Sequence, residues 1–286
     1  MNSVSIVIPA KNESGGLNKL LPDLVKLEEV REIIVVDDGS TDDTAEVCRK
    51  HGVRLVRHPY SKGNGAAIKT GASSANGQII VFMDADGQHN AIDVVRLINH
   101  YQTGYAMVVG ARSNQSQASV ARLAANTMYN RMASMMVGHK VEDLTSGFRI
   151  VNAQKFRKFL HLLPNGFSYP TTSTMAFFRS GYSVGYIPIV ADKRIGKSHI
   201  SILKDGSRFL LIIFKLATLY SPLKIFVPIS LGFFVSGFGY YIYTFFSSGR
   251  FTNMSALLFS TSIIVFLIGL VSEQVTTLLY SRSDNS

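Results

Sequence analysis

Short runs of apolar, mostly β-branched residues alternate with helical patterns along the first two thirds of the chain. The apolar runs are continuous rather than alternating, which indicates strands buried on both faces and hence a mainly parallel sheet covered by helices. The predicted strands are Val4–Ile8, Glu32–Asp37, Val53–Arg57, Gln78–Met83, Ala106–Gly110 and Ser183–Val190. The predicted helices are Glu13–Leu27, Thr41–His51, Gly65–Ala75, Ala91–Tyr101 and Ala118–Val137. This alternation predicts a doubly wound α/β domain, in which ligands bind beyond the carboxyl ends of the strands.

The last third of the chain has a different pattern. Two stretches, Ile225–Phe246 and Met254–Ser272, contain no charged residue, and each is long enough to cross ~30 Å of hydrocarbon as a helix. Before them, residues 200–219 carry apolar residues at helical spacing with interspersed lysine and arginine, which favours helices lying along a membrane surface over a surface helix packed on the domain. We therefore expect an α/β domain over residues 1–199, amphipathic interfacial helices over 200–221, and two transmembrane helices with a short tail over 222–286.

The charge of the chain fits a membrane better than nucleic acid. Only 17% of the 286 residues are charged, against ~25% in typical soluble proteins, and the formal net charge is +10. An anionic membrane surface and nucleic acid both attract such a chain, but the basic residues gather just before the first apolar stretch and no nucleic-acid-binding motif accompanies them. We expect no nucleic-acid partner. Because positive residues flank the cytoplasmic ends of spans, we expect a cell-membrane protein with its α/β domain and both termini in the cytoplasm.

Polar clusters follow four of the predicted strands, at Pro9–Glu13, Asp37–Ser40, Asp84–His89 and Gly110–Arg112. Asp84 and Asp86 flank one residue directly after a strand, so both carboxylates can approach the same point. Two such oxygen ligands suit Mg²⁺ or Mn²⁺, which also bind substrate phosphates. An acidic turn that only caps a helix is the alternative interpretation. The single cysteine, Cys48, excludes an intrachain disulfide and a cysteine-based metal site.

Together with Lys62–Gly65 and Asp143–Arg149, which reads Asp-Leu-Thr-Ser-Gly-Phe-Arg, these clusters make the chain resemble the inverting family-2 glycosyltransferases of GT-A fold. More narrowly, it resembles their polyprenyl-phosphate branch, which includes dolichyl-phosphate mannose synthase and bacterial undecaprenyl-phosphate glycosyltransferases. The likeness covers residues 3–198, and the two spans match a membrane-anchored subgroup. It implies transfer of a sugar from a nucleotide-sugar, expected to be UDP-linked, to a polyprenyl phosphate at the cytoplasmic membrane face, with inversion and with Mg²⁺ or Mn²⁺ as cofactor.

The resemblance also implies roles for individual residues. The nucleotide-sugar would be bound by Pro9, Lys11, Glu13, Val36, Asp38, Asp84, Ala85, Asp86, Arg194 and Lys197. The metal would be held by Asp84, Asp86 and Gln88. The acceptor phosphate would face Arg112, Arg122 and Arg149. The candidate catalytic residues are Asp86, Arg112 and Asp143, of which Asp143 either orients a substrate or acts as a base.

Other interpretations stay open at this stage. One is a glycosyltransferase whose acceptor is a protein or a free sugar, and another is a membrane protein that binds nucleotide-sugars without turnover. A processive polysaccharide synthase is disfavoured, because the chain has no tryptophan for the Gln-x-x-Arg-Trp motif of those enzymes. Asp38 can instead form a tight turn, and Arg112 and Arg149 can instead pair with buried carboxylates. A homo-oligomer is compatible with the resemblance.

Overall fold

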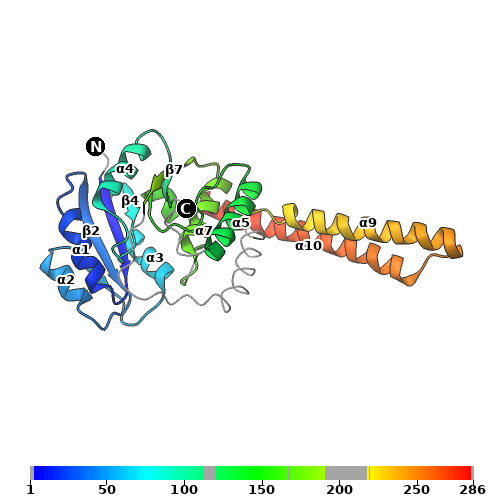
Figure 1. Ribbon diagram of the computed structural model, residues 1–286, viewed down its shortest axis with the longest axis horizontal. Helices are drawn as coiled ribbons and strands as arrows, with labels where there is room; N and C mark the ends of the chain where they lie inside the picture. Colours follow the sequence, from blue (N-terminus) through cyan, green and yellow to red (C-terminus); the bar gives the residue numbers. More distant parts are fainter. Residues whose placement is uncertain (1–2, 113–119, 167, 191–217, 219, 285–286) are drawn as a thin grey trace. The chain divides into compact units, whose positions relative to one another are not determined.

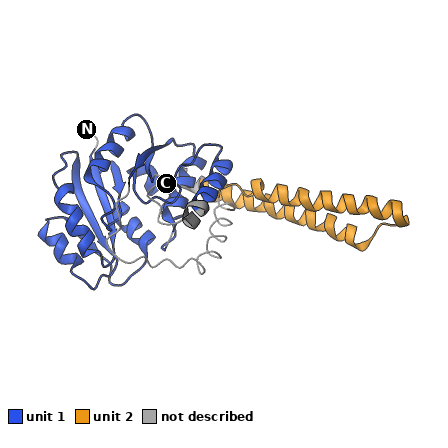
Figure 2. Ribbon diagram, in the orientation of Figure 1, with its two compact units in different colours: residues 1–202 blue, residues 203–286 orange. Residues whose placement is uncertain are grey.

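The chain forms two compact units, residues 1–202 and 203–286 (Figure 2). The computed structural model describes residues 3–112, 120–166, 168–190, 218 and 220–284, with the backbone alone for 120–125 and 281–284. The predicted interfacial helices at 200–221 therefore lie almost entirely outside the described residues. The division of the chain into three segments stays a prediction.

A seven-stranded sheet in the order β3-β2-β1-β4-β6-β5-β7 forms the centre of the first unit (Figure 1). All neighbouring strands are parallel except β6, which is antiparallel to both β4 and β5. The predicted α/β class with a mainly parallel sheet is thus confirmed. The strands are β1 Val4–Ala10, β2 Val30–Asp37, β3 Arg54–Arg57, β4 Ile79–Phe82, β5 Met107–Arg112, β6 Arg149–Asn152 and β7 Val184–Ile189.

Helices cover both faces of the sheet. Ile6 and Ile8 of β1 belong to the same buried cluster as apolar residues of α1 and α4. Successive side chains of a strand point to opposite faces, and Val7 accordingly lies against Gly71 of α3. The central strands are therefore buried on both sides, as their continuous apolar runs predict. The helices of this unit are α1 Ser14–Leu24, α2 Thr44–Lys50, α3 Asn64–Ser74, α4 Ala91–Tyr101, α5 Val120–Val137, α6 Ala153–Arg157 and α7 Tyr169–Arg179.

The antiparallel strand β6 is the main departure from the predicted elements. It has only four residues, of which Ile150 and Val151 are apolar, so it carries too short a pattern to be recognised as a strand. Its insertion between β4 and β5 pairs Arg149 with Phe82 on one side and Val109 on the other. Because β6 runs against its neighbours, it begins where they end. The turn at 143–148 therefore lies at the same edge of the sheet as the loops that follow β4 and β5.

The second unit contains two long apolar helices, α9 Leu223–Ser248 and α10 Asn253–Asp284. Their most apolar windows have mean hydropathies of 1.7 and 2.4, and only 11% and 17% of those windows are buried. Apolar side chains that stay exposed over such lengths fit a lipid environment rather than the core of a soluble protein. Both predicted apolar spans are thus helices, and α10 continues twelve residues beyond Ser272.

Small and hydroxylated residues fix how α9 and α10 pack on each other. The hydroxyls of Ser230 and Ser262 each donate to the other residue's backbone carbonyl at 2.9 Å. At Gly237 and Gly269 the backbone approaches the partner helix so closely that an added Cβ would lie 3.0 Å from Leu258 and 2.6 Å from Phe226. Such close approach, with hydroxyls bonded across the interface, is typical of helices that pack inside a membrane.

We predict that Gly16→Ala destabilises the first unit by about 2 kcal/mol, within the usual cost of overpacking. Gly16 lies in the first turn of α1, where a Cβ would come 2.1 Å from the carbonyl oxygen of Ala85. Gly15 in the same turn has nothing within 4 Å of its Cβ position, so Gly15→Ala is the matched control. Thermal unfolding of the purified protein measures both variants. Equal unfolding midpoints for the two variants would contradict the prediction.

Candidate active site

The turns that follow β1 and β2 are joined into one surface at the carboxyl edge of the sheet. The N–H of Asn12 donates to Ser40 Oγ at 2.9 Å, and the N–H of Thr41 donates to Asn12 Oδ1 at 2.8 Å. Asn12 has a φ of 55°, a left-handed conformation that asparagine tolerates better than most residues. Lys11 is exposed on this surface and Glu13 is half-buried, whereas Pro9 and Val36 pair in the sheet and are buried beneath it.

Asp38 holds the loop that follows β3. Its Oδ1 accepts from His58 Nδ1 at 2.7 Å and the N–H of Lys62 at 2.8 Å, and its Oδ2 accepts from Ser61 Oγ at 2.8 Å and the N–H of Gly63 at 2.9 Å. Burial alone would raise the pKa of Asp38, but these four donors outweigh it and lower the pKa to about 2. Asp38 thus fixes the position of Lys62 beside the surface formed by the first two turns.

The two glycines of the Lys62–Gly65 cluster serve a close backbone contact. Gly63 has a φ of 101°, and an added Cβ at Gly65 would lie 2.0 Å from the carbonyl oxygen of Pro164. The N–H groups of Gly65 and Ala66, at the start of α3, donate to the carbonyls of Gly166 and Asn165. These N–H groups are therefore already bonded within the protein, and the start of α3 is not a phosphate cradle.

The acidic turn after β4 is packed tightly between neighbouring segments. Asp86 is 8% exposed and Ala85 is buried against α1. Asp84 lies against Gly147 of the 143–149 turn, where an added Cβ would come 2.9 Å from its Oδ2. The N–H of Gln88 donates to Asp86 Oδ1 at 3.2 Å. The three predicted metal ligands thus share one short and well-supported turn.

His89 closes the other side of this turn. Its ring stacks on Phe148 with centroids 4.5 Å apart and an interplanar angle of 15°. Burial lowers the pKa of His89 to about 4 against the opposing effect of Asp86, so the ring is neutral near pH 7. Its Nδ1 is buried and has no hydrogen-bond partner among the described residues. A buried ring nitrogen without a partner among the described residues, close to the carboxylate of Asp86, fits a site that a further group completes.

The residues on the acidic turn fit a divalent cation that is shared with a phosphate ligand. Among the described residues no three His, Cys, Asp or Glu side chains form a complete metal cage. Mg²⁺ is usually held by one or two carboxylates together with substrate phosphates rather than by an all-protein cage. Two carboxylates and an amide oxygen on one turn match that donor set. Asp84, Asp86 and Gln88 are therefore the residues that could hold such an ion.

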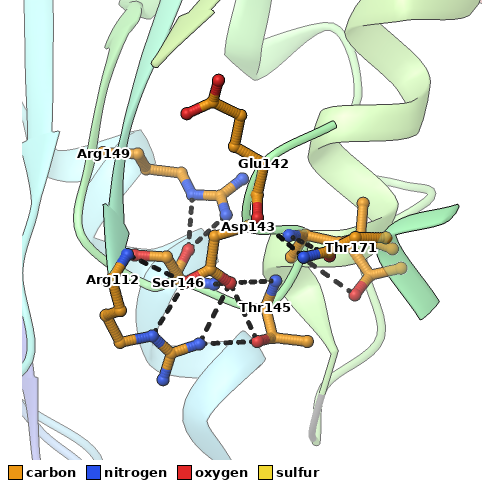
Figure 3. Close-up of polar contacts among 9 residues, drawn as sticks. Arg112, Glu142, Asp143, Thr145, Ser146, Arg149 and Thr171 are labelled. Atoms are coloured by element: carbon orange, nitrogen blue, oxygen red, sulfur yellow. Dashed lines mark hydrogen bonds and ion pairs between the residues drawn. The ribbon is translucent and has the colours of Figure 1, made fainter. Parts of the chain in front are cut away.

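Arg112, at the end of β5, is held by Asp143 in a two-pronged ion pair (Figure 3). Its Nε donates to Asp143 Oδ2 at 2.8 Å and its Nη2 to Asp143 Oδ1 at 3.1 Å, while Nη2 also donates to Thr145 Oγ1 at 2.6 Å. These bonds fix the plane of the guanidinium. Among the residues described, none accepts a hydrogen bond from Nη1. Arg112 is thus paired with a buried carboxylate, which was the structural alternative considered for it, and its Nη1 has no acceptor among the described residues.

The carboxylate of Asp143 accepts hydrogen bonds from six donor groups. Besides Nε and Nη2 of Arg112, its donors are the N–H groups of Arg112, Thr145 and Ser146 and the hydroxyl of Thr145. Burial would raise the pKa of Asp143, but Arg112 and the other donors lower it below the ordinary value. An ionised carboxylate whose two oxygens are fully engaged is a poor proton acceptor. Its geometry therefore favours positioning of Arg112 over action as a base.

Arg149 is completely buried, with no exposed surface. Nη1 donates to the carbonyl of Pro170 at 2.8 Å and to the hydroxyls of Ser173 and Thr174 at 2.9 Å, while Nε donates to the carbonyl of Ser146 at 3.2 Å and Nη2 bonds the same carbonyl. A ligand phosphate has no access to a side chain in this position. Arg149 instead ties the 143–149 turn to the start of α7, which differs from the acceptor contact expected for it.

Three other expected site residues cannot be placed. Arg194 and Lys197 lie outside the described residues, and so does the side chain of Arg122. Conversely, the structure brings in Tyr169, whose hydroxyl donates to the carbonyl of Gly147 at 2.9 Å, and His58, which contacts Asp38. Tyr169 lies at the start of α7, away from the polar clusters that follow the strands. His58 directly follows β3, so its place at a strand end is the signal that could have identified it.

Comparison with known proteins gives a matching family model for each of the two parts of the chain. Residues 5–160, more than half of the chain, match the family model described as glycosyl transferase family 2, and residues 221–278 match the GtrB C-terminal hairpin. A dolichyl-phosphate hexose transferase from Haloferax volcanii is 24% identical, with 72% of this chain and 90% of that protein aligned.

Two further relatives extend the comparison. An undecaprenyl-phosphate 4-deoxy-4-formamido-L-arabinose transferase from Proteus mirabilis is 33% identical over 50% of this chain, which spans about half of that longer protein (47%). Glucosyl-3-phosphoglycerate synthase from Mycobacterium tuberculosis, in complex with Mn²⁺ and UDP-glucose, has a TM-score of 0.59 at 23% identity, covering 76% of this chain and 78% of the synthase. At that identity the likeness shows a shared GT-A fold.

We predict that Asp38→Asn destabilises the protein in a pH-dependent way. The lowering of the pKa of Asp38 from 3.8 to about 2 corresponds to about 2 kcal/mol of stability. Because the folded-state pKa is the lower one, this contribution is complete above pH ~4 and is lost as the pH falls towards 2, so that about half remains at pH 3.

Thermal unfolding of wild type and variant between pH 7 and pH 3 measures this dependence. The difference between the two proteins should be constant from pH 7 to pH 5 and should shrink below pH ~4. Asp43→Asn, which changes an exposed carboxylate of the neighbouring turn, is the control and should unfold like wild type at each pH. A difference between Asp38→Asn and wild type that is the same at pH 3 and pH 7 would refute the clamp role.

Proposed function

The chain belongs to glycosyl transferase family 2, and on that premise we propose that it transfers a sugar from a nucleotide-sugar to a polyprenyl phosphate at a membrane surface. That it is a glycosyltransferase follows from the family; the donor, the acceptor and the mechanism are the proposal. The observation that carries it is the pairing of an acidic turn with a fixed arginine at one sheet edge, in a chain that also has two apolar helices. The acceptors named for the relatives, dolichyl phosphate and undecaprenyl phosphate, support the lipid.

The donor nucleotide would lie over the turns that follow β1 and β2. Lys11 and Lys62 are both exposed, and Asp38 accepts a hydrogen bond from the backbone N–H of Lys62. Two ammonium groups would thus be available to the nucleotide. Asp84 and Asp86 would hold Mg²⁺ or Mn²⁺ with Gln88, and a bound divalent cation would neutralise the charge of the leaving nucleoside diphosphate. The mycobacterial synthase shows that this fold can seat Mn²⁺ and a UDP-sugar together.

The acceptor phosphate would face Nη1 of Arg112, which has no acceptor among the described residues. One of its oxygens would form a bond to the anomeric carbon while the bond from that carbon to the nucleoside diphosphate breaks, and the diphosphate would leave with the electron pair. Such a single displacement inverts the configuration of the sugar. A phosphate monoester has a second pKa of ~6 and is largely dianionic at pH 7, so no proton has to be removed first. The full engagement of Asp143 by six donor groups supports this reading.

The apolar helices α9 and α10 support a membrane location for the enzyme. A polyprenyl chain stays in the bilayer and its phosphate lies at the interface, so an anchored enzyme meets the acceptor without extracting it. We place the catalytic unit and both termini on the cytoplasmic side, because lysines and arginines precede α9 while the turn between the helices carries Arg250 as its only charge.

A glycosyltransferase with a non-lipid acceptor is the second candidate. For such an enzyme the hairpin would only localise the protein, and the acceptor would need a base to deprotonate a hydroxyl. The engagement of Asp143 disfavours that role for this residue. Acceptor competition separates the two candidates directly.

We predict that the purified full-length protein transfers labelled sugar from a UDP-sugar, or failing that a GDP-sugar, to undecaprenyl phosphate. Label should appear in the organic phase with Mg²⁺ or Mn²⁺ and should disappear with EDTA. Asp86→Ala should lower the rate at least a hundredfold, because the charge of the departing diphosphate then lacks its counter-ion.

Asp23→Asn is the control for this assay, because Asp23 is an exposed carboxylate that pairs with Lys26, and it should transfer like wild type. Transfer to free sugars or peptides with none to undecaprenyl phosphate would favour the second candidate. Transfer by Asp86→Ala at the wild-type rate would remove this residue from the metal role.

We also predict that Arg112→Lys raises KM for undecaprenyl phosphate about tenfold and changes KM for the donor much less. A lysine keeps the charge but cannot hold Asp143 with two bonds while offering a third nitrogen to a phosphate. Initial rates with each substrate varied in turn measure both constants. Arg131→Lys, at an exposed position of α5, is the matched control. A larger change in the donor KM would reassign Arg112 to the nucleotide-sugar.

A further inference from the structure

Arg149 is a buried cation whose hydrogen-bond partners are all neutral. It is 0% exposed. Its partners among the described residues are backbone carbonyls and hydroxyls of the 143–149 turn and of α7, together with the sulfur of Met107. Burying a guanidinium without a bonded carboxylate is costly. A neutral donor could tie the two segments together at a lower desolvation cost. The positive charge itself therefore needs an explanation.

The position of Arg149 relates it to the acidic turn. Arg149 of β6 pairs with Phe82 of the antiparallel strand β4. Gly147, two residues before Arg149, therefore lies opposite Asp84, two residues after Phe82, and the carboxylate of Asp84 lies against Gly147. The hydroxyl of Tyr169 donates to the carbonyl of Gly147 at 2.9 Å. The guanidinium carbon of Arg149 lies 5.8 Å from the centre of the Tyr169 ring. Arg149 and Asp84 thus lie at adjacent strand ends in the interior and interact electrostatically. Charges in the interior are screened far less than charges on the surface.

We infer that Arg149 is the resident counter-charge of the Asp84–Asp86 turn and lowers the affinity of that turn for a free divalent cation. Arg149 is buried and would touch no substrate, so it would act on the cation only through the electrostatic effect of its charge. Its charge stabilises the carboxylate of Asp84 while no cation is bound and repels a cation that arrives alone. A cation accompanied by the phosphates of a nucleotide brings its own negative charge and is opposed less. The inference rests on the proposed metal role of Asp84 and Asp86.

A purely structural role for Arg149 predicts the opposite change in affinity. If the side chain only holds the 143–149 turn in place, any substitution displaces Gly147 and Asp84 and weakens cation binding. If its charge opposes the cation, a neutral residue that keeps a donor strengthens binding, while lysine leaves it near the wild-type value. The sign of the change in affinity therefore distinguishes the two roles.

The test is a Mn²⁺ titration of the full-length protein in detergent without nucleotide, followed by the electron paramagnetic resonance of free Mn²⁺. Arg149→Gln should bind Mn²⁺ about tenfold more tightly than wild type, the scale expected for removing one charge at this range, and Arg149→Lys should stay within about twofold of wild type. Arg157→Gln is the matched control, because Arg157, like Arg149, donates to neutral acceptors, here the carbonyls of Ala72 and Ala75. This variant should leave the affinity unchanged. Asp84→Asn should abolish the tight site in the Arg149→Gln background.

Weaker or unchanged binding in Arg149→Gln, weaker binding in Arg149→Lys, or no Mn²⁺ binding in any variant would overturn the inference. Thermal unfolding of each variant is measured in parallel. If Arg149→Gln does not fold, Arg149→Met is measured in its place. If neither neutral variant folds, the Mn²⁺ affinity of Arg149→Lys alone distinguishes the two roles. The titration measures no turnover, so a failure of this inference does not affect the result of the transferase assay, which tests the proposed function separately.

Discussion

The ion pair between Arg112 and Asp143 is the interaction on which the candidate site depends. One carboxylate receives six donor groups, and three of them belong to Arg112. The pair fixes the arginine at the end of β5 and at the same time winds the 143–146 segment into a turn. That turn leads into β6, whose antiparallel register lays Gly147 against Asp84. The five residues from Asp143 to Gly147 thereby connect the arginine assigned to the acceptor with the acidic turn assigned to the donor.

Much of the fold could be predicted from the pattern of apolar residues. The parallel strands carry continuous runs such as Ile33 to Val36, which are long enough to indicate burial on both faces, and α9 and α10 follow from uncharged stretches. The strand β6 could not be predicted, because a four-residue segment that begins with arginine and ends with asparagine has no period of its own. The strand forms because its backbone pairs with both β4 and β5.

The candidate site was predictable as a set of residues but not as a set of roles. The polar clusters at strand ends point to Asp84, Asp86 and Arg112 because topology brings strand ends together. The sequence does not reveal that Asp38 is engaged by a loop twenty residues later, since such bonds depend on tertiary packing. Nor does it reveal the burial of Arg149. A charged residue in a polar motif is ordinarily exposed, and only the pairing of β6 places it inside.

The state of Asp143 has a consequence for the kind of acceptor that suits this site. A hydroxyl acceptor must lose its proton as it attacks, which requires a base with a free lone pair and a pKa near the working pH. Asp143 has neither property, because its oxygens are engaged and Arg112 and the other donors keep its pKa low. A phosphate acceptor is already ionised and asks instead for a fixed positive charge. Arg112 offers that charge on a guanidinium that Asp143 holds through Nε and Nη2, so the bonds that make Asp143 a poor base also fix Arg112 in place as a receptor for a phosphate.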